Sequence, residues 1–181
     1  MAESLLPGEA PVSLNEARSW LRLGATVDDA VVAGLVRAAT NICEAFIGRW
    51  LIVRIGEEIL PPKDGTVQPS ARPVVGIESV ALIFPDGDES DLGDGDYRMS
   101  VDIDGTARIV MVGAGNAVRA RVAYRAGIAE GANAIPEAIR QGILRMTQHL
   151  HEARDGAAIA PPAAIAALWQ PWRRLTLGGG R

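Results

Sequence analysis

The chain has 181 residues, 48% of them hydrophobic, so it can bury a sizeable core and is not a disordered segment. Its single cysteine, Cys43, excludes an internal disulfide and a cysteine-cluster metal site, and we expect this thiol to lie in the core. The net charge of −4 divides into −9 over residues 1–118 and +5 over residues 119–181, which indicates either two surfaces for different partners or scattered solvated charges.

Two helices are predicted near the N-terminus. The run Ser13-Leu14-Asn15-Glu16 is typical of a capping box, and Gly24 is expected to end the first helix. The second helix, capped by Thr26 or Asp28, extends to about residue 48, because apolar residues recur in it every three or four positions. Neither a secretory leader nor an apolar stretch of roughly 18 residues is recognised, so we expect a protein made in the bacterial cytoplasm that does not enter a membrane.

The central part of the chain has the pattern of a β-structure. Strands are predicted over residues 50–55, 74–84, 97–101, 107–112 and 118–124, with Asp104-Gly105 as a hairpin turn. The last of these strands alternates apolar residues with Arg119, Arg121 and Arg125, which predicts one buried face and one arginine face.

Two further helices are predicted after this β-structure. Pro136 is expected in the first turn of the longer one, whose apolar stripe contains Ile139, Ile143 and Met146. The shorter helix begins near Pro161-Pro162 and stops at Pro171. The glycine-rich end of the chain has no reason to fold by itself.

These elements predict an α+β fold. Two N-terminal and two C-terminal helices form a helical body, with a small antiparallel β subdomain inserted between them and a flexible C-terminal tail. The expected boundaries are residues 1–48 and 127–170 for the helices, 49–126 for the β subdomain, and 171–181 for an extended tail.

No catalytic or metal-binding pattern emerges from the polar residues. His149 and His151 are two apart on a predicted helix and therefore point in different directions. The acidic stretch that includes Asp86, Asp88 and Asp91 fails the EF-hand pattern, because Ser90 stands at a ligand position and the closing glutamate is missing. We expect no enzymatic activity and no cofactor, with a small metal-dependent enzyme using the acidic loop as the remote alternative.

The order of the elements and several local runs resemble the head–tail connector (adaptor) family of tailed phages and gene transfer agents. The resembling segments are Val12-Ser13-Leu14-Asn15-Glu16-Ala17, the helix from Asp28-Asp29 to Gly48-Arg49, Tyr124-Arg125-Ala126-Gly127, Ile135 to Ile143, and Leu168 to Arg174. The departure is at Gln148 to His151, where family members often carry an aromatic residue.

The resemblance implies a structural subunit of a ring, typically of twelve copies, that docks under the capsid portal and extends the DNA channel. Its partners would be other copies of itself, the portal protein, a stopper or tail protein, and DNA passing non-specifically. The C-terminal segment would engage the portal, through Trp169, Trp172, Arg173, Arg174, Leu175 and Arg181. Ring-interface or channel-facing residues would be Asp86, Asp88, Asp91, Asp94, Asp96, Arg119, Arg121 and Arg125. Another connector layer, a stopper or a tail-completion protein, is the alternative.

Overall fold

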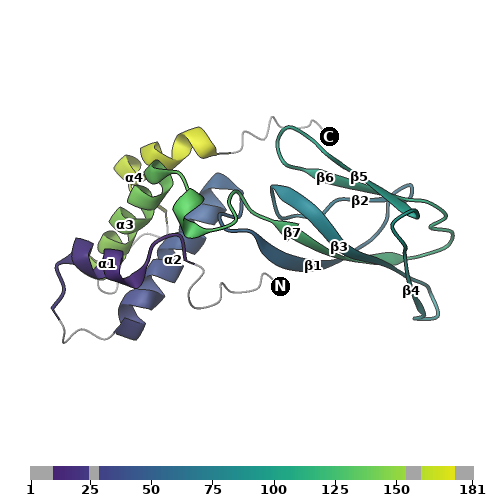
Figure 1. Ribbon diagram of the computed structural model, residues 1–181, viewed down its shortest axis with the longest axis horizontal. Helices are drawn as coiled ribbons and strands as arrows, with labels where there is room; N and C mark the ends of the chain where they lie inside the picture. Colours follow the sequence, from purple (N-terminus) through teal and green to yellow (C-terminus); the bar gives the residue numbers. More distant parts are fainter. Residues whose placement is uncertain (1–9, 25–28, 154–159, 174–181) are drawn as a thin grey trace. The chain divides into compact units, whose positions relative to one another are not determined.

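The computed structural model describes residues 10–24, 29–153 and 160–173 and divides the chain into two compact units (Figure 1). One unit is Val53–Ile128 and contains all the strands of the described chain; the other joins the helical segments that precede and follow it. The fold is therefore α+β, but the expected helical body with a small β insert is wrong. The middle of the chain forms two antiparallel sheets, one of four strands and one of three, and makes up a full unit by itself.

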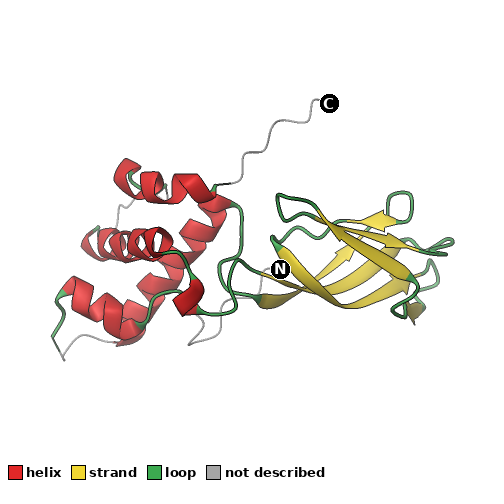
Figure 2. Cartoon of the chain, turned by 45° about the horizontal axis from the view of Figure 1, so that its top comes forward, coloured by secondary structure: helices red, strands yellow, loops and turns green. Residues whose placement is uncertain are grey.

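The helical unit contains the helices α1 (Leu14–Leu21), α2 (Asp29–Ile47), α3 (Glu137–Glu152) and α4 (Ala163–Trp169). One short 3-10 helix, Ala132–Ala134, precedes α3, and another, Gln170–Trp172, follows α4 (Figure 2). The predicted capping box at the start of α1 is confirmed: the Ser13 hydroxyl accepts from the Glu16 N–H, and the Glu16 carboxylate accepts from the Ser13 N–H. Gly24 does not end this helix, because Arg22 adopts the left-handed cap conformation at φ 55°.

Helix α2 passes through the core of the helical unit and contacts α1, α3 and α4. Its 19 residues are long and apolar enough to cross a membrane by length and composition, contrary to the expectation from the sequence. The buried residues of α2 recur at helical spacing and pack against the buried stripe of α3. This packing in a folded core explains why α2 is so apolar. The buried residues include Val32, Val36, Ala39, Cys43 and Ile47 on α2 and Ile139, Ile143 and Met146 on α3.

Cys43 lies in the core of the helical unit, as the sequence predicted. Cys43 has no exposed surface, and burial, followed by the neighbouring charge of Glu44, raises the pKa of its thiol. A thiol in this position is a small apolar core group and does not react as a nucleophile.

The β unit begins with β1 (Arg54–Leu60), followed by β2 (Thr66–Val67), β3 (Val74–Ile83) and β4 (Glu89–Asp91). Next come β5 (Tyr97–Val101), β6 (Ala107–Met111) and β7 (Arg119–Ala126). The four-stranded sheet has the order β1-β7-β3-β4 and the three-stranded sheet the order β2-β6-β5; the two sheets lie against each other in Figures 1 and 2. The predicted hairpin at Asp104-Gly105 is confirmed as the connection between β5 and β6.

The first predicted strand is displaced. Residues 50–55 were expected to be β, but β1 starts only at Arg54, and Leu51 and Ile52 belong to the helical unit, where they are buried. The Leu51 N–H donates to the Glu44 carboxylate at 2.8 Å, and Ile52 forms a bridge with Ala129. This apolar run therefore joins the end of the first segment of the helical unit to the start of its second segment at Ala129.

The interior of the β unit is made by alternate residues of its strands. In β7, Ala120, Val122, Tyr124 and Ala126 are buried, and the residues between them face outward, which confirms the alternation predicted for this strand. The Tyr124 hydroxyl donates to Glu58, which also accepts from the Ser70 hydroxyl at 2.8 Å. Burial, followed by the hydrogen bond to Glu58 and its charge, raises the pKa of Tyr124, so this phenol stays protonated as a structural donor.

Candidate functional site

The outward side of the four-stranded sheet brings most of the predicted arginines together. The strand register places Ile55 of β1 opposite Arg125 of β7, Glu57 opposite Ala123, and Ile59 opposite Arg121. These six residues and Arg119 point away from the buried core, and we call them the outer face. It combines the guanidinium groups of β7 with exposed aliphatic side chains, because Ile55 is 55% and Ile59 46% exposed.

The arginines of the outer face are not a separate basic surface. Arg121 lies between two carboxylates, with Nη2 2.7 Å from Glu89 on β4 and Nη1 3.2 Å from Glu57 on β1. The hydrogen bond and charge of Glu89, and then those of Glu57, raise the pKa of Arg121. Arg125 approaches Glu78 at 3.9 Å, so positive and negative groups alternate across this sheet. Exposed pairs of this kind stabilise the fold only weakly, by about 0–1 kcal/mol each.

The predicted acidic residues are all exposed and lie on turns and edges of the β unit. Asp86 and Asp88 occupy the turn between β3 and β4, Asp91 ends β4, and Asp94 and Asp96 lie between β4 and β5. Two of these carboxylates cap the backbone of their own turns: Asp86 accepts from the Asp88 N–H at 3.1 Å, and Asp96 from the Gly93 N–H at 3.1 Å.

Metal ligation finds no support in this acidic stretch. Within the described ranges, no group of three or more histidine, cysteine or carboxylate residues is placed to hold a metal ion. His149 and His151 both lie in the last turn of α3.

Trp169 was expected to be an anchor for the portal, but it belongs to the core of the helical unit. Its side chain has no exposed surface, and its indole N–H donates to the Ile139 carbonyl at 3.3 Å. The ring centroid lies 5.9 Å from that of Phe46, and the space for the indole exists because residue 142 is glycine. A side chain enclosed in this way has no surface to offer to another protein.

The described residues that follow Trp169, up to Arg173, are wholly or partly accessible. Trp172 is half-buried, Arg173 is exposed, and the Arg173 guanidinium lies 5.1 Å from the centre of the Phe46 ring. This distance is within the range of a cation–π interaction. Arg174, Leu175 and Arg181, which complete the predicted portal-binding set, lie outside the described residues, as does the rest of segment 174–181 of the predicted tail. Pro171 and Trp172, which were expected to begin that extended tail, belong instead to the 3-10 helix Gln170–Trp172.

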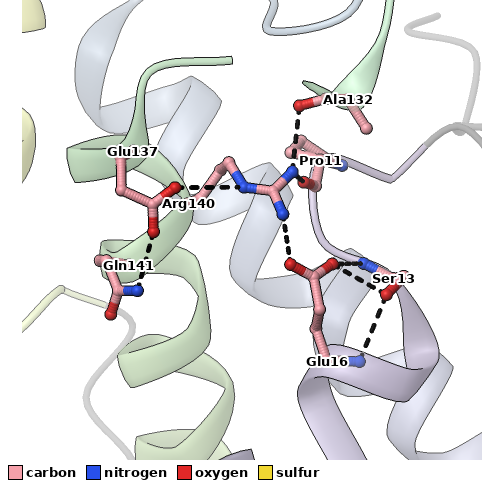
Figure 3. A network of polar contacts seen from close by, with 7 residues as sticks. All are labelled: Pro11, Ser13, Glu16, Ala132, Glu137, Arg140 and Gln141. Atoms are coloured by element: carbon pink, nitrogen blue, oxygen red, sulfur yellow. Dashed lines mark hydrogen bonds and ion pairs between the residues drawn. The ribbon is translucent and has the colours of Figure 1, made fainter. Parts of the chain in front are cut away.

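The sequence did not reveal the polar node centred on Arg140, drawn in Figure 3. From α3, Arg140 donates to the Pro11 carbonyl at 2.7 Å and to the Ala132 carbonyl at 3.0 Å, and it pairs with Glu16 on α1. Glu16 thus serves two functions, since it also closes the capping box with Ser13. The capping box was the available signal, but nothing in the local sequence marks the arginine 124 positions away as its partner.

Comparison with known proteins gives a match along the whole chain. No protein-family model and no curated protein matches it. Among solved structures, it is 26% identical to a chain in the neck of an empty gene transfer agent (GTA) particle, computed with C6 symmetry, with a TM-score of 0.77 over 99% of this chain and 97% of that one.

Two further structures agree with this match. A chain in the virion of the native GTA particle is 26% identical, with a TM-score of 0.77 over 97% of this chain and 95% of that one. A chain in the neck of the native particle, computed with C12 symmetry, has the same fold at 24% identity, with a TM-score of 0.76 over 100% and 99% of the two chains. The resemblance to head–tail connector proteins of phages and gene transfer agents that the sequence suggested is confirmed by this likeness.

Proposed function

We propose that this chain is a structural head–tail adaptor of a phage or a phage-like particle. Identical copies, twelve in the full ring, dock beneath the portal, extend the DNA channel and offer a platform for the stopper or tail. The chain is made in the bacterial cytoplasm and ends in the particle at the head–tail junction. The observation that carries this proposal is the full-length likeness to GTA neck and virion chains at 26% identity, which includes both units of the fold.

The described surface suits a ring subunit. In a ring each copy must present two different, complementary surfaces, and an outer face of mixed charge with exposed isoleucines is one such surface. Arg119, Arg121 and Arg125 are therefore proposed at a subunit interface.

The exposed carboxylates suit a channel. Each phosphate that a protein neutralises strengthens its binding to DNA, so a channel wall benefits from repelling the duplex. The exposed Asp86, Asp88, Asp91, Asp94 and Asp96 are proposed to face DNA as it passes or to line the adjoining interface.

Portal binding is proposed for the end of the chain. Trp172, Arg173 and the segment 174–181, with Arg174, Leu175 and Arg181, form the binding element. Trp169 is not part of it, because its buried indole instead fixes the base of this element to the helical core. Tryptophan and arginine are the residue types most often found as interface hot spots.

Two truncations test this assignment. A chain that ends at Arg173 keeps Trp169 and should retain its melting temperature while losing affinity for the portal protein. A chain that ends at Leu168 removes Trp169, and its melting temperature should fall. Portal affinity measured by biolayer interferometry, unchanged in the chain that ends at Arg173, would contradict the assignment of segment 174–181.

The size of the β unit favours a second candidate, another connector layer such as a stopper or tail-completion protein. Connector layers of that kind are dominated by β-structure, and here the strands form a unit of their own. Binding of the purified chain to the portal protein, in the absence of any other neck component, favours the adaptor; binding only to an assembled adaptor favours the stopper.

A further inference from the structure

The hairpin between β5 and β6 presents one isoleucine entirely to solvent. Ile103 has a relative exposure of 108%, and Met99 and Val101, which precede it at alternate positions of the edge strand β5, are 39% and 44% exposed. Exposed apolar side chains grouped in this way are typical of a surface that another protein covers.

The backbone around Ile103 is held in place by the rest of the hairpin. The Gly105 N–H donates to the Asp102 carbonyl at 2.8 Å, and the Asp102 N–H to the Thr106 carbonyl at 2.9 Å. Asp104 accepts from the Thr106 hydroxyl at 2.6 Å and pairs with Arg72 at 3.2 Å. These hydrogen bonds and this ion pair therefore hold residues 102–106, which we call the hairpin tip, in a defined turn.

Close packing fixes the hairpin tip to the start of β3. The Val74 N–H donates to the Gly105 carbonyl at 3.2 Å, and a Cβ at position 105 would lie 2.6 Å from the Pro73 Cβ. With φ at +83°, Gly105 also has a backbone that other residues rarely adopt. The backbone at Ile103 is consequently held in place before any binding, which lowers the entropy lost when this residue binds a partner.

The outer face offers a complementary surface on a different side of the same unit. On β1, Ile55 and Ile59 lie on either side of Glu57, which pairs with Arg121, and Arg125 stands opposite Ile55. The Arg125 side chain is 43% exposed, and the exposed Asp102 stands next to Ile103 on the hairpin tip. Ile103 beside the Asp102 carboxylate thus matches the exposed Ile55 beside the Arg125 guanidinium.

We propose that the hairpin tip of one copy packs on the outer face of the next copy in the ring. Ile103 packs on Ile55, and Asp102 faces Arg125. Because the hairpin tip and the outer face are different surfaces, the contact is heterologous, which is the type of contact that forms a ring when the rotation between copies closes. This inference rests on the proposed ring, and the 12-fold and 6-fold symmetry of the GTA necks that the chain resembles motivates a second copy as the occupant.

The direct test is a cross-linking experiment on the full chain mixed with the portal protein. A double variant, Ile103→Cys with Ile55→Cys, should give a ladder of covalent multimers with a bismaleimide, because each copy then links to its neighbour. The matched control combines Ile55→Cys with Val112→Cys, since Val112 is also exposed, at 58%, and lies just after β6. Native Cys43 is buried and present in both variants.

A second variant measures the contribution of the Ile103 side chain to subunit association. Ile103→Ser should weaken subunit association by ~10-fold or more, as expected for an interface hot spot, with an unchanged melting temperature. Val112→Ser should leave association unchanged.

The outcomes separate the two proposals. A ladder for the 103/55 variant alone supports the inference. Rings seen by mass photometry together with equal cross-linking of both variants overturn the inference and leave the proposed function intact, for example if the hairpin tip binds the portal. The absence of any ring in the presence of portal protein overturns the proposed function and, with it, the inference.

Discussion

At the scale of single residues, the core of the helical unit depends on a glycine and a tryptophan that are distant in sequence. Gly142 on α3 faces the Trp169 indole, and a Cβ at position 142 would lie 2.7 Å from Cε2 of that ring, closer than real contacts allow. The sequence showed only a tryptophan two residues before a proline, which fits an exposed anchor as well as a core residue. The space that Gly142 leaves could not be seen without the packing of α3 against α4.

We therefore expect Gly142→Ala to destabilise the protein by about 1–3 kcal/mol, as overpacking in a core does. The matched control is Gly34→Ala in α2, where the nearest atom to a new Cβ is the end of the Arg37 side chain at 4.0 Å. That substitution should be neutral or stabilising by up to about 1 kcal/mol, because alanine is the better helix former. Urea unfolding of the two variants checks the prediction, and equal stability of both would contradict it.

At the scale of elements, the parts with a strong local period were predictable. The capping box of α1, the alternation of β7 and the Asp104-Gly105 hairpin follow from residues close in the sequence, and the structure contains all three. The apolar run at residues 50–55 was wrongly predicted as a strand, since its burial against Glu44 and Ala129 depends on distant contacts. The Arg140 node escaped prediction for the same reason.

The link between α1 and α3 has a pH dependence whose sign is fixed. The Ser13 backbone N–H, followed by its hydroxyl and by the Arg140 guanidinium, holds the pKa of Glu16 below its ordinary value of 4.5. A carboxyl whose pKa is lower in the folded state stabilises the fold above its unfolded pKa, and this contribution is lost as the pH falls through the folded pKa. Protonation below pH 4.5 should therefore loosen the contact between α1 and α3.

Glu16→Gln isolates this contribution, because glutamine can still cap α1 but carries no charge for Arg140. We expect a lower melting temperature than that of the wild type at pH 7 and a difference that disappears as the pH falls below 4.5. Glu137→Gln is the matched control, since Glu137 lies 3.7 Å from the same arginine but is 73% exposed. A difference between wild type and Glu16→Gln that is independent of pH would contradict this account.

At the scale of the whole molecule, the order helix–strand–helix was correctly predicted, but the size of the β-structure relative to the helices was not. Short strands separated by turns, such as β2 and β4, give little periodic signal, so the sequence did not show that the middle of the chain builds two sheets. The exposed Ile103 at the hairpin tip also escaped notice, because exposure is a property of the folded unit and not of the local sequence. The likeness to GTA neck chains covers both units, and it is the basis of the proposed adaptor role.

Copies of this chain are proposed to form a closed ring on the portal, and cryo-electron microscopy of the purified chain mixed with its portal protein would show such a ring. We expect rings of identical subunits, twelve in each, with a central opening wide enough for duplex DNA and the C-terminal segment against the portal. Particles that contain only monomers or compact twofold dimers, with the portal surface left bare, would contradict it.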